Sequence, residues 1–202
     1  IDVSMMEGQL SLLGTMLGSY LASGEVPAPM GTAYKALLPY QTFRTRTREL
    51  ALAVGSEKLW KIFCPLIGCP GLAADPRYRS NGARDANRES LVAKLQEAFL
   101  TRSYEEWEAL LVKSGIPVGT VNTLAEVVKH PQVKARGSFV EMDHPSVGKV
   151  PVVGVPVRLS ATPGSVRTPS PTLGQHTDEV LRDLLGLGAP EIATLRAAGV
   201  IT

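Results

Sequence analysis

The sequence predicts an α/β fold, made of a small middle domain and two flanking helical arms, and two observations support this. Short runs rich in strand-forming residues alternate with stretches in which apolar residues recur every three or four positions. Breaks rich in Gly and Pro, or in Pro, Ser and Thr, lie at about residues 24–31 and 162–171. We therefore expect a helical arm at residues 1–30, a small α/β domain at 31–160, and a connector with C-terminal helices at 161–202.

The first arm is predicted to be one buried helix over residues 3–21. Its apolar residues recur at helical spacing, namely Met6, Leu10, Leu13, Leu17 and Leu21. The chain enters this pattern with neither an initiator Met nor a signal-peptide pattern, so we expect it to begin inside a domain. A single helix encloses no core, and we expect the apolar stripe to pack on a surface outside the arm.

The middle domain is predicted to begin with an antiparallel hairpin and to continue as helices. Residues 39–43 and 49–54 are rich in strand formers and flank a polar turn. Helices are expected at residues 56–67, 85–100 and 103–113, capped by Ser56, Asp85 and Ser103. Glu106, three residues after Ser103, would complete a capping box.

The last part of the chain is predicted to contain shorter elements. After a turn at residues 115–119 we expect a short strand and then a helix at 123–129. Valines among Pro and Gly at 139–159 indicate short irregular strands. One final helix is expected to be capped by Thr177 and to run to Leu185, and another to run from Pro190 to Ala198. These helices are too small to form a core of their own.

The composition excludes several classes of function. Lys and Arg number 21 against 19 Asp and Glu, and a net charge of +2 does not predict binding to nucleic acid or anionic lipid. No apolar run approaches the roughly 20 residues that a membrane span needs, so no membrane association is expected. Two cysteines cannot make a disulfide framework, which favours a reducing compartment, and we expect a cytoplasmic protein.

The cysteines and histidines do not form a metal-site pattern. Cys64 and Cys69 have no second Cys or His pair near them, and His130, His144 and His176 are far apart in the sequence. We therefore expect buried structural thiols and no metal ion. The sequence also lacks the P-loop, dinucleotide-binding, esterase and zinc-protease motifs.

Two groups of arginines leave two interpretations open. They are Arg44, Arg46 and Arg48 in the hairpin, and Arg77, Arg79, Arg84 and Arg88 around Asn81 and Asn87. Guanidinium forks suit phosphate and carboxylate, so either group could bind an anion if its members share one side. We favour a solvated hairpin tip for the first group, and salt bridges with Asp75, Asp85 and Glu89 explain the second equally well.

Two carboxylate pairs, Glu105-Glu106 and Asp178-Glu179, suggest acid–base chemistry at first sight. Both pairs lie in the first turn of an expected helix, where negative charge complements the helix dipole. We interpret them as helix-start residues.

The motifs taken in order resemble those of the family III CoA-transferases, which include formyl-CoA transferases and carnitine-type CoA-transferases. The resemblance covers almost the whole chain, and its most specific motif is the last. The motifs are Ile1-Asp2-Val3-Ser4-Met5-Met6-Glu7, Pro39-Tyr40-Gln41-Thr42-Phe43, Leu52-Ala53-Val54-Gly55 with Trp60, Asp75-Pro76-Arg77-Tyr78 with Asn81, Arg84 and Asn87-Arg88, Gly115-Ile116-Pro117-Val118-Gly119, His130-Pro131-Gln132-Val133, and Pro171-Thr172-Leu173-Gly174-Gln175-His176-Thr177-Asp178-Glu179-Val180-Leu181.

The resemblance implies an enzyme that moves CoA from an acyl-CoA to a carboxylic acid through an aspartyl-CoA thioester. In the family the nucleophilic Asp lies upstream of the segment matching residues 1–7, so we assign no catalytic residue and expect the chain to be inactive alone. Asp2 belongs to the helix opening and is not that nucleophile. The substrate is a CoA thioester, and Met5 corresponds to a segment near the acyl group, which makes it a candidate substrate-binding residue, although core packing also explains it.

The resemblance also accounts for the arms and leaves alternatives. In the family, the arms belong to a Rossmann-like large domain, the middle segment forms a small domain, and two subunits interlock, which implies a homodimer. The N-terminal half of the family's proteins, which carries the nucleophilic Asp, could be a separate chain. Two other functions stay open: a non-catalytic scaffold or interaction module from a truncated gene, and part of a 2-methylacyl-CoA racemase.

Overall fold

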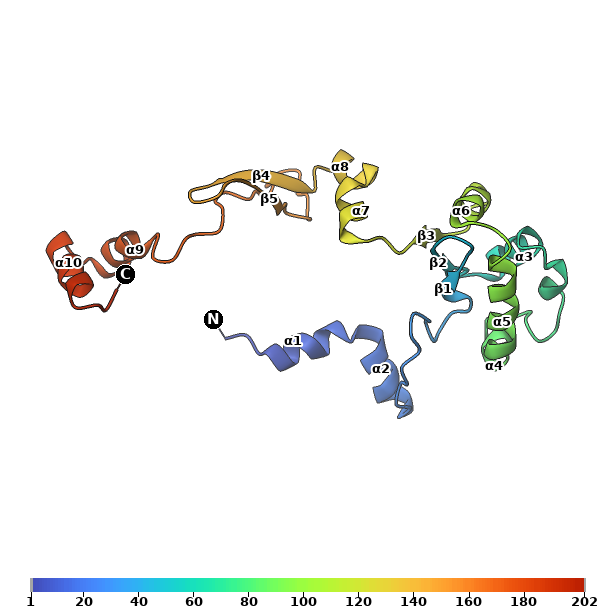
Figure 1. Cartoon of the computed structure of the whole chain (residues 1–202). Coiled ribbons are helices and arrows are strands. Elements are labelled where there is room, and N and C mark those ends of the chain that lie inside the picture. Colours follow the sequence, from blue (N-terminus) through green and yellow to red (C-terminus); the bar gives the residue numbers. More distant parts are fainter. Residues whose placement is uncertain (1, 202) are drawn as a thin grey trace. The chain divides into compact units, whose positions relative to one another are not determined.

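The computed structural model describes residues 2–201 and divides the chain into two compact units, Ile1–Val121 and Asn122–Thr202 (Figure 1). The boundary between these units lies inside the expected middle domain of residues 31–160. The assignment of the flanking segments to a larger domain stays a prediction. No helix within residues 2–201 is long and apolar enough to cross a membrane.

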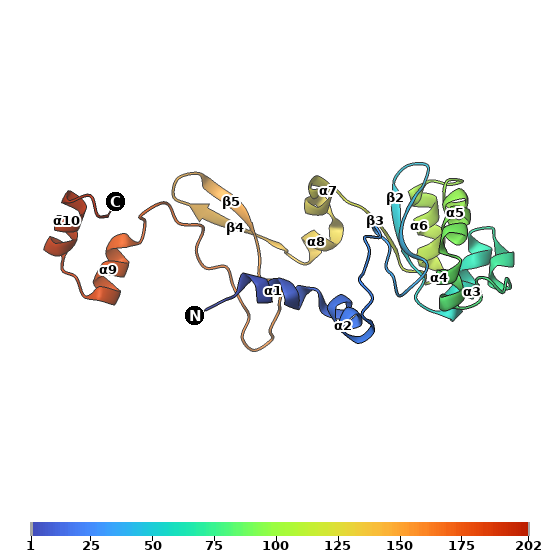
Figure 2. The ribbon, with the colours of Figure 1, turned by 90° about the horizontal axis from the view of Figure 1, so that it is seen from below.

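The first unit contains a three-stranded antiparallel sheet with the predicted hairpin at its centre. Strand β2 (Glu49–Ala53) lies between β1 (Tyr40–Arg44) and β3 (Val118–Thr120). The register pairs Phe43 with Leu50 and Leu52 with Val118. In both views, helices lie on one face of this sheet (Figures 1 and 2). These helices are α3 (Glu57–Leu66), α4 (Asn81–Ala86), α5 (Arg88–Phe99) and α6 (Tyr104–Lys113), and the 3₁₀ turn η1 (Pro70–Ala73) follows α3.

Aromatic side chains fill the space between the sheet and the helices. Phe99, at the end of α5, lies at the centre, with its ring 5.0 Å from that of Phe43, 6.1 Å from Phe63 and 5.3 Å from Trp107. All four side chains are buried. The indole of Trp107 donates a hydrogen bond to the Phe99 carbonyl at 2.9 Å, so the ring is buried without an unpaired N–H.

The predicted caps are confirmed for two helices and wrong for the third. Ser56 caps α3, and Ser103 forms a complete capping box with Glu106 at the start of α6. The expected helix at 85–100 is two helices, because Asn87 leaves helical geometry at φ −118° and becomes the N-cap of α5. Asp85 lies inside α4, which begins after Ser80, so the prediction of Asp85 as a cap is wrong.

The predicted single buried helix at 3–21 is also wrong. The segment forms α1 (Met5–Leu12) and α2 (Gly14–Ser23), broken where Gly14 takes a left-handed backbone at φ +46°. Neither helix has a buried residue, and Leu12 and Leu21 are exposed. The apolar stripe is present, but the described residues supply no surface that covers it.

The second unit begins and ends with helices. Thr123 and Glu126 form the capping box of α7 (Leu124–Lys129), as the expected helix start requires. The structure adds α8 (Pro131–Ala135), which sequence reasoning missed although Pro at a first helical position signals it. The two last helices are α9 (Thr177–Leu185) and α10 (Ala189–Ala197), so His176, and not Thr177, is the N-cap residue of α9.

Between these helices the expected irregular strands form a regular hairpin. Strand β4 (Phe139–His144) pairs with β5 (Gly148–Val153) along its whole length. Among the described residues of this unit only Ile192 is buried. The second unit therefore has local structure without a closed hydrophobic core.

Candidate functional site

Met5, the candidate substrate-binding residue, is the first residue of α1. Ser4 caps the helix by accepting a hydrogen bond from the backbone N–H of Glu7 at 3.3 Å. The Met5 side chain is 84% exposed, so the described residues put no pocket wall against it. Ile1, the first residue of this motif, lies outside the described residues.

The first arginine group does not share one side of a strand, because β1 ends at Arg44 and residues 45–48 form a turn. The hydroxyl of Thr45 holds this turn by accepting hydrogen bonds from the N–H groups of Thr47 and Arg48 at 3.2 Å. Arg46 pairs with Glu106 at 2.9 Å, and Arg48 donates to the carbonyl of Val121 at 3.1 Å. These contacts favour the structural interpretation of the group over an anion site.

The paired carboxylates Glu105 and Glu106 are helix-start residues, as predicted. Glu106 accepts from the backbone N–H of Ser103 at 2.8 Å, and this bond is the main reason that its pKa lies below the ordinary value. Glu105 also has a lowered pKa, chiefly from a bond to its own backbone, and accepts from the Thr47 hydroxyl at 3.2 Å. Both groups are held ionised, which does not suit them as general acids.

Most members of the second arginine group bind partners within the domain. Arg84 is buried and contacts both oxygens of Glu57 at 2.9 Å. Arg77 pairs with Asp75 at 2.7 Å. These two ion pairs support the salt-bridge interpretation, although the expected partner set was incomplete, since Glu57 was not foreseen.

Arg88 pairs with Asp85 at 2.7 Å, as predicted, and Arg79, the remaining member of the group, is exposed. Its Nη2 also donates to the backbone carbonyls of Tyr34 and Lys35, at 3.5 and 3.2 Å. Its Nη1 is buried with no hydrogen-bond partner among the described residues. Backbone carbonyls from a distant segment are partners that no sequence pattern indicated.

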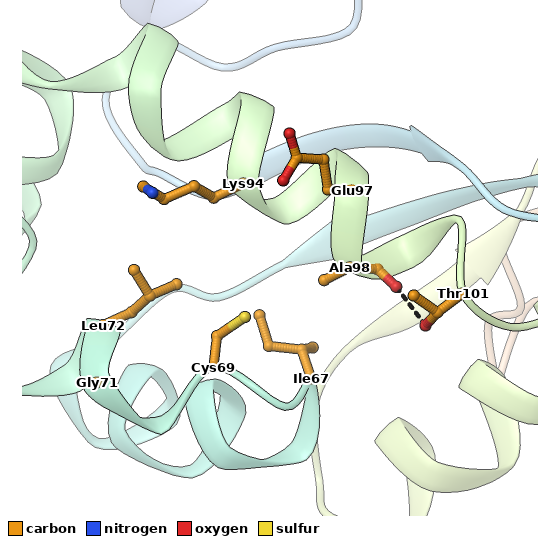
Figure 3. A pocket seen from close by; sticks show the side chains of 8 residues that line it. All are labelled: Ile67, Cys69, Gly71, Leu72, Lys94, Glu97, Ala98 and Thr101. Carbon is orange, nitrogen blue, oxygen red and sulfur yellow. Dashed lines mark hydrogen bonds between the residues drawn. The ribbon is translucent and has the colours of Figure 1, made fainter.

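The two thiols have different environments. Cys64 is fully buried, and burial is the main cause that raises its pKa to about 12, so it is a protonated structural thiol as predicted. Cys69 is only half-buried, so the prediction of a buried thiol is wrong there, and it lies at the edge of a surface pocket of about 560 Å³ (Figure 3). The pocket lies between η1 and α5, and Figure 3 shows Lys94 and Glu97 on the α5 side of it, opposite Cys69. Within residues 2–201, no three His, Cys, Asp or Glu side chains group as a metal site.

The most specific motif, residues 171–181, consists of a loop and the first residues of α9. Residues of both parts line a pocket of about 380 Å³. Gln175 closes the loop by accepting from the backbone N–H of Thr172 at 2.9 Å. His176 Nδ1 lies 3.1 Å from a carboxylate oxygen of Glu179, and Asp178 pairs with Arg196 of α10. The motif therefore organises a loop and a helix pair.

Comparison with known proteins gives a consistent result over the whole chain. The model of CoA-transferase family III matches residues 1–177. Succinyl-CoA:glutarate CoA-transferase from Mus musculus is 35% identical over 201 residues, which is 100% of this chain and 46% of that protein. Formyl-CoA:oxalate CoA-transferase from Bradyrhizobium diazoefficiens is 34% identical over 143 residues, covering 71% of this chain and 33% of that protein.

A solved structure agrees with these sequence relatives. The crystal structure of a CAIB/BAIF family protein from Brucella suis matches with a TM-score of 0.68 and 33% identity. The match covers 86% of this chain and 45% of that one, so the chain spans less than half the length of this protein and of the mouse relative. The sequence, the α/β architecture and the order of motifs lead to the same conclusion: the chain belongs to CoA-transferase family III.

Proposed function

We propose that this chain is part of an enzyme that moves CoA from an acyl-CoA to a carboxylic acid. The observation that carries the proposal is the match with CoA-transferases along the whole chain. The relatives from Mus musculus and Bradyrhizobium diazoefficiens are both named for exchange between a CoA thioester and a dicarboxylic acid, which favours transfer over epimerisation. Because the chain spans 46% of the mouse protein, the activity is proposed for the whole protein.

The proposed reaction proceeds through a carboxylate nucleophile. An Asp carboxylate attacks the thioester carbonyl, CoA leaves as a thiolate, and a mixed anhydride remains. The thiolate then attacks the aspartyl carbonyl of the anhydride, which releases the donor's carboxylate and leaves an aspartyl-CoA thioester. The acceptor carboxylate repeats these two steps in reverse, so CoA moves without an oxidant and the steps themselves need no metal ion.

We place the nucleophile outside this chain, because the resemblance to the family implies an Asp upstream of the segment that matches residues 1–7. Three carboxylates of the first unit have structural partners. Glu57 binds Arg84, Asp75 binds Arg77, and Glu106 caps α6. Met5 is proposed to form part of the substrate pocket of the whole protein, and its exposed side chain is free to do so. A homodimer and a cytoplasmic location complete the proposal.

The test follows intact mass and product during incubation with succinyl-CoA, with and without glutarate. Without an acceptor, the whole protein should gain CoA as a thioester on a carboxylate outside residues 1–202, and glutarate should then release it as glutaryl-CoA. The chain alone should not change in mass, because the nucleophile is proposed to lie outside it.

Three outcomes would contradict the proposal. A CoA adduct on a carboxylate within this chain would show that the nucleophile is misplaced. Epimerisation of a 2-methylacyl-CoA without any acceptor would identify a racemase. A whole protein that forms neither adduct nor product with succinyl-, formyl- or acetyl-CoA would be a scaffold.

A further inference from the structure

The segment that joins α2 to β1 is bound to the domain through its backbone. Arg88 Nη2 donates to the carbonyls of Tyr34 and Lys35, and Asn81 Nδ2 donates to the carbonyl of Ala36 at 2.8 Å. Leu38 is bound at both ends: its N–H donates to Asn81 Oδ1 at 2.9 Å. Its carbonyl accepts from Arg84 Nε at 2.7 Å.

Acidic side chains hold two of the three residues that make these contacts by their guanidinium groups, and hold the third, Asn81, by its backbone. Glu57 binds the guanidinium of Arg84 through both oxygens, and its Oε1 also accepts from the backbone N–H of Asn81 at 3.0 Å. Asp85 holds Arg88 at 2.7 and 3.0 Å. Because the donors are anchored before they reach the segment, little further side-chain entropy is lost when they bind it.

We propose that Asn81, Arg84 and Arg88 form a backbone clamp that makes residues 34–38 a fixed part of the domain. Hydrogen bonds from charged donors are among the stronger ones in proteins. The clamp goes beyond the proposed transfer reaction and does not depend on it.

The clamp also locates the joint between the domain and helices α1 and α2. The Thr32 hydroxyl lies 2.9 Å from that of Thr42 on β1 and accepts from the Thr42 N–H at 3.1 Å, which extends the fixed segment to residue 32. The remaining residues, 24–31, begin with Gly24 and end with Gly31, both in left-handed geometry. An ion pair between Glu25 and Lys35 crosses this joint, but both side chains are exposed and the pair contributes little.

Trypsin tests the clamp, because trypsin cleaves after Lys35. The peptide bond that it would cut joins Lys35 to Ala36, and the clamp binds the backbone carbonyls of both residues. Cleavage requires the segment to leave the clamp and extend into the protease. We expect Arg88→Ala and Asn81→Ala to increase the rate of cleavage after Lys35 about tenfold or more in the full chain, followed by mass spectrometry. Arg79→Ala removes an exposed arginine from the same region and should leave that rate unchanged.

The other tryptic sites of the domain decide whether an effect is local. Cleavage after Arg102, which precedes α6, and after Lys113, the last residue of α6, should proceed at the wild-type rate in Arg88→Ala and Asn81→Ala. Equal Lys35 rates in wild type and both variants would overturn the clamp. So would an equal acceleration at Lys35, Arg102 and Lys113, because these residues would then support the whole fold and not this segment.

Discussion

Replacing Phe99 by Ala should lower the free energy of unfolding by about 4 kcal/mol, the largest stability loss we expect from a single substitution. Phe99 is fully buried and contacts the rings of Phe43, Phe63 and Trp107. Its removal leaves a cavity where sheet and helices meet, and three aromatic partners lose their shared neighbour. Urea denaturation followed by tryptophan fluorescence measures the loss, because both tryptophans are buried in this core.

Leu100→Ala is the matched control for this prediction. Leu100 is the next residue and is 44% exposed, so its truncation should cost less than about 1 kcal/mol. Similar losses for Phe99→Ala and Leu100→Ala would mean that the aromatic cluster does not hold the domain together.

Arg84→Met should have the second largest effect, a loss of about 3 kcal/mol. Arg84 is 1% exposed, stacks over Trp60 at 4.9 Å and donates to the carbonyls of Leu38 and Tyr78. Met keeps most of the volume but leaves these buried carbonyls without a donor. Glu57 is less affected, since it is half-exposed and regains water. Urea denaturation at neutral pH measures the loss, and Arg79→Ala, at an exposed position, should have almost none.

The same substitution should change the acid sensitivity of the domain. The hydrogen bond from Arg84 is the main reason that the pKa of Glu57 lies below its ordinary value. The stabilisation from Glu57 is therefore complete above a pH of about 4.3 and is lost as the pH falls through the lowered pKa. Arg84→Met should lose less stability than wild type in this acidic range, and an identical acid dependence would contradict the role of the pair.

Local signals in the sequence predicted local structure well. Ser103 with Glu106, and Thr123 with Glu126, mark helix starts because capping needs only residues three positions apart. The cap at Asp85 failed because Asp85 lies inside α4, and the break before α5 comes two residues later at Asn87. The Asn87 side chain bonds to the carbonyls of Arg77 and Ala83. The position of this break depends on tertiary contacts that no local pattern contains.

Burial was predictable only where the chain contains both an apolar face and the surface that covers it. The stripe of the first arm was identified correctly as apolar, yet Leu12 is 79% exposed and Leu21 is 73% exposed. Hydrophobic spacing shows that a helix has an apolar face, but not which surface covers it. The buried core is instead concentrated in the first unit, where the sheet and α3–α6 supply one another's partners.

The candidate site shows the same limit. The order of motifs along the chain was enough to identify the family, which the comparisons confirm. The arginines could not be assigned from sequence, because Arg84 and Arg88 bind backbone carbonyls as much as 54 residues away. Sequence spacing gives no information about contacts at that separation.

A native mass spectrum of the purified chain at high concentration tests the central claim most directly, namely that its two ends are built to pack on surfaces outside this chain. Met5, Leu12 and Leu21 at one end, and Leu173 and Leu184 at the other, are more than 70% exposed. Exposed apolar area of this kind drives association. We therefore predict a complex, either a homodimer of the 21.6 kDa chain or the chain bound to a second polypeptide. A stable monomer at high concentration would contradict the account.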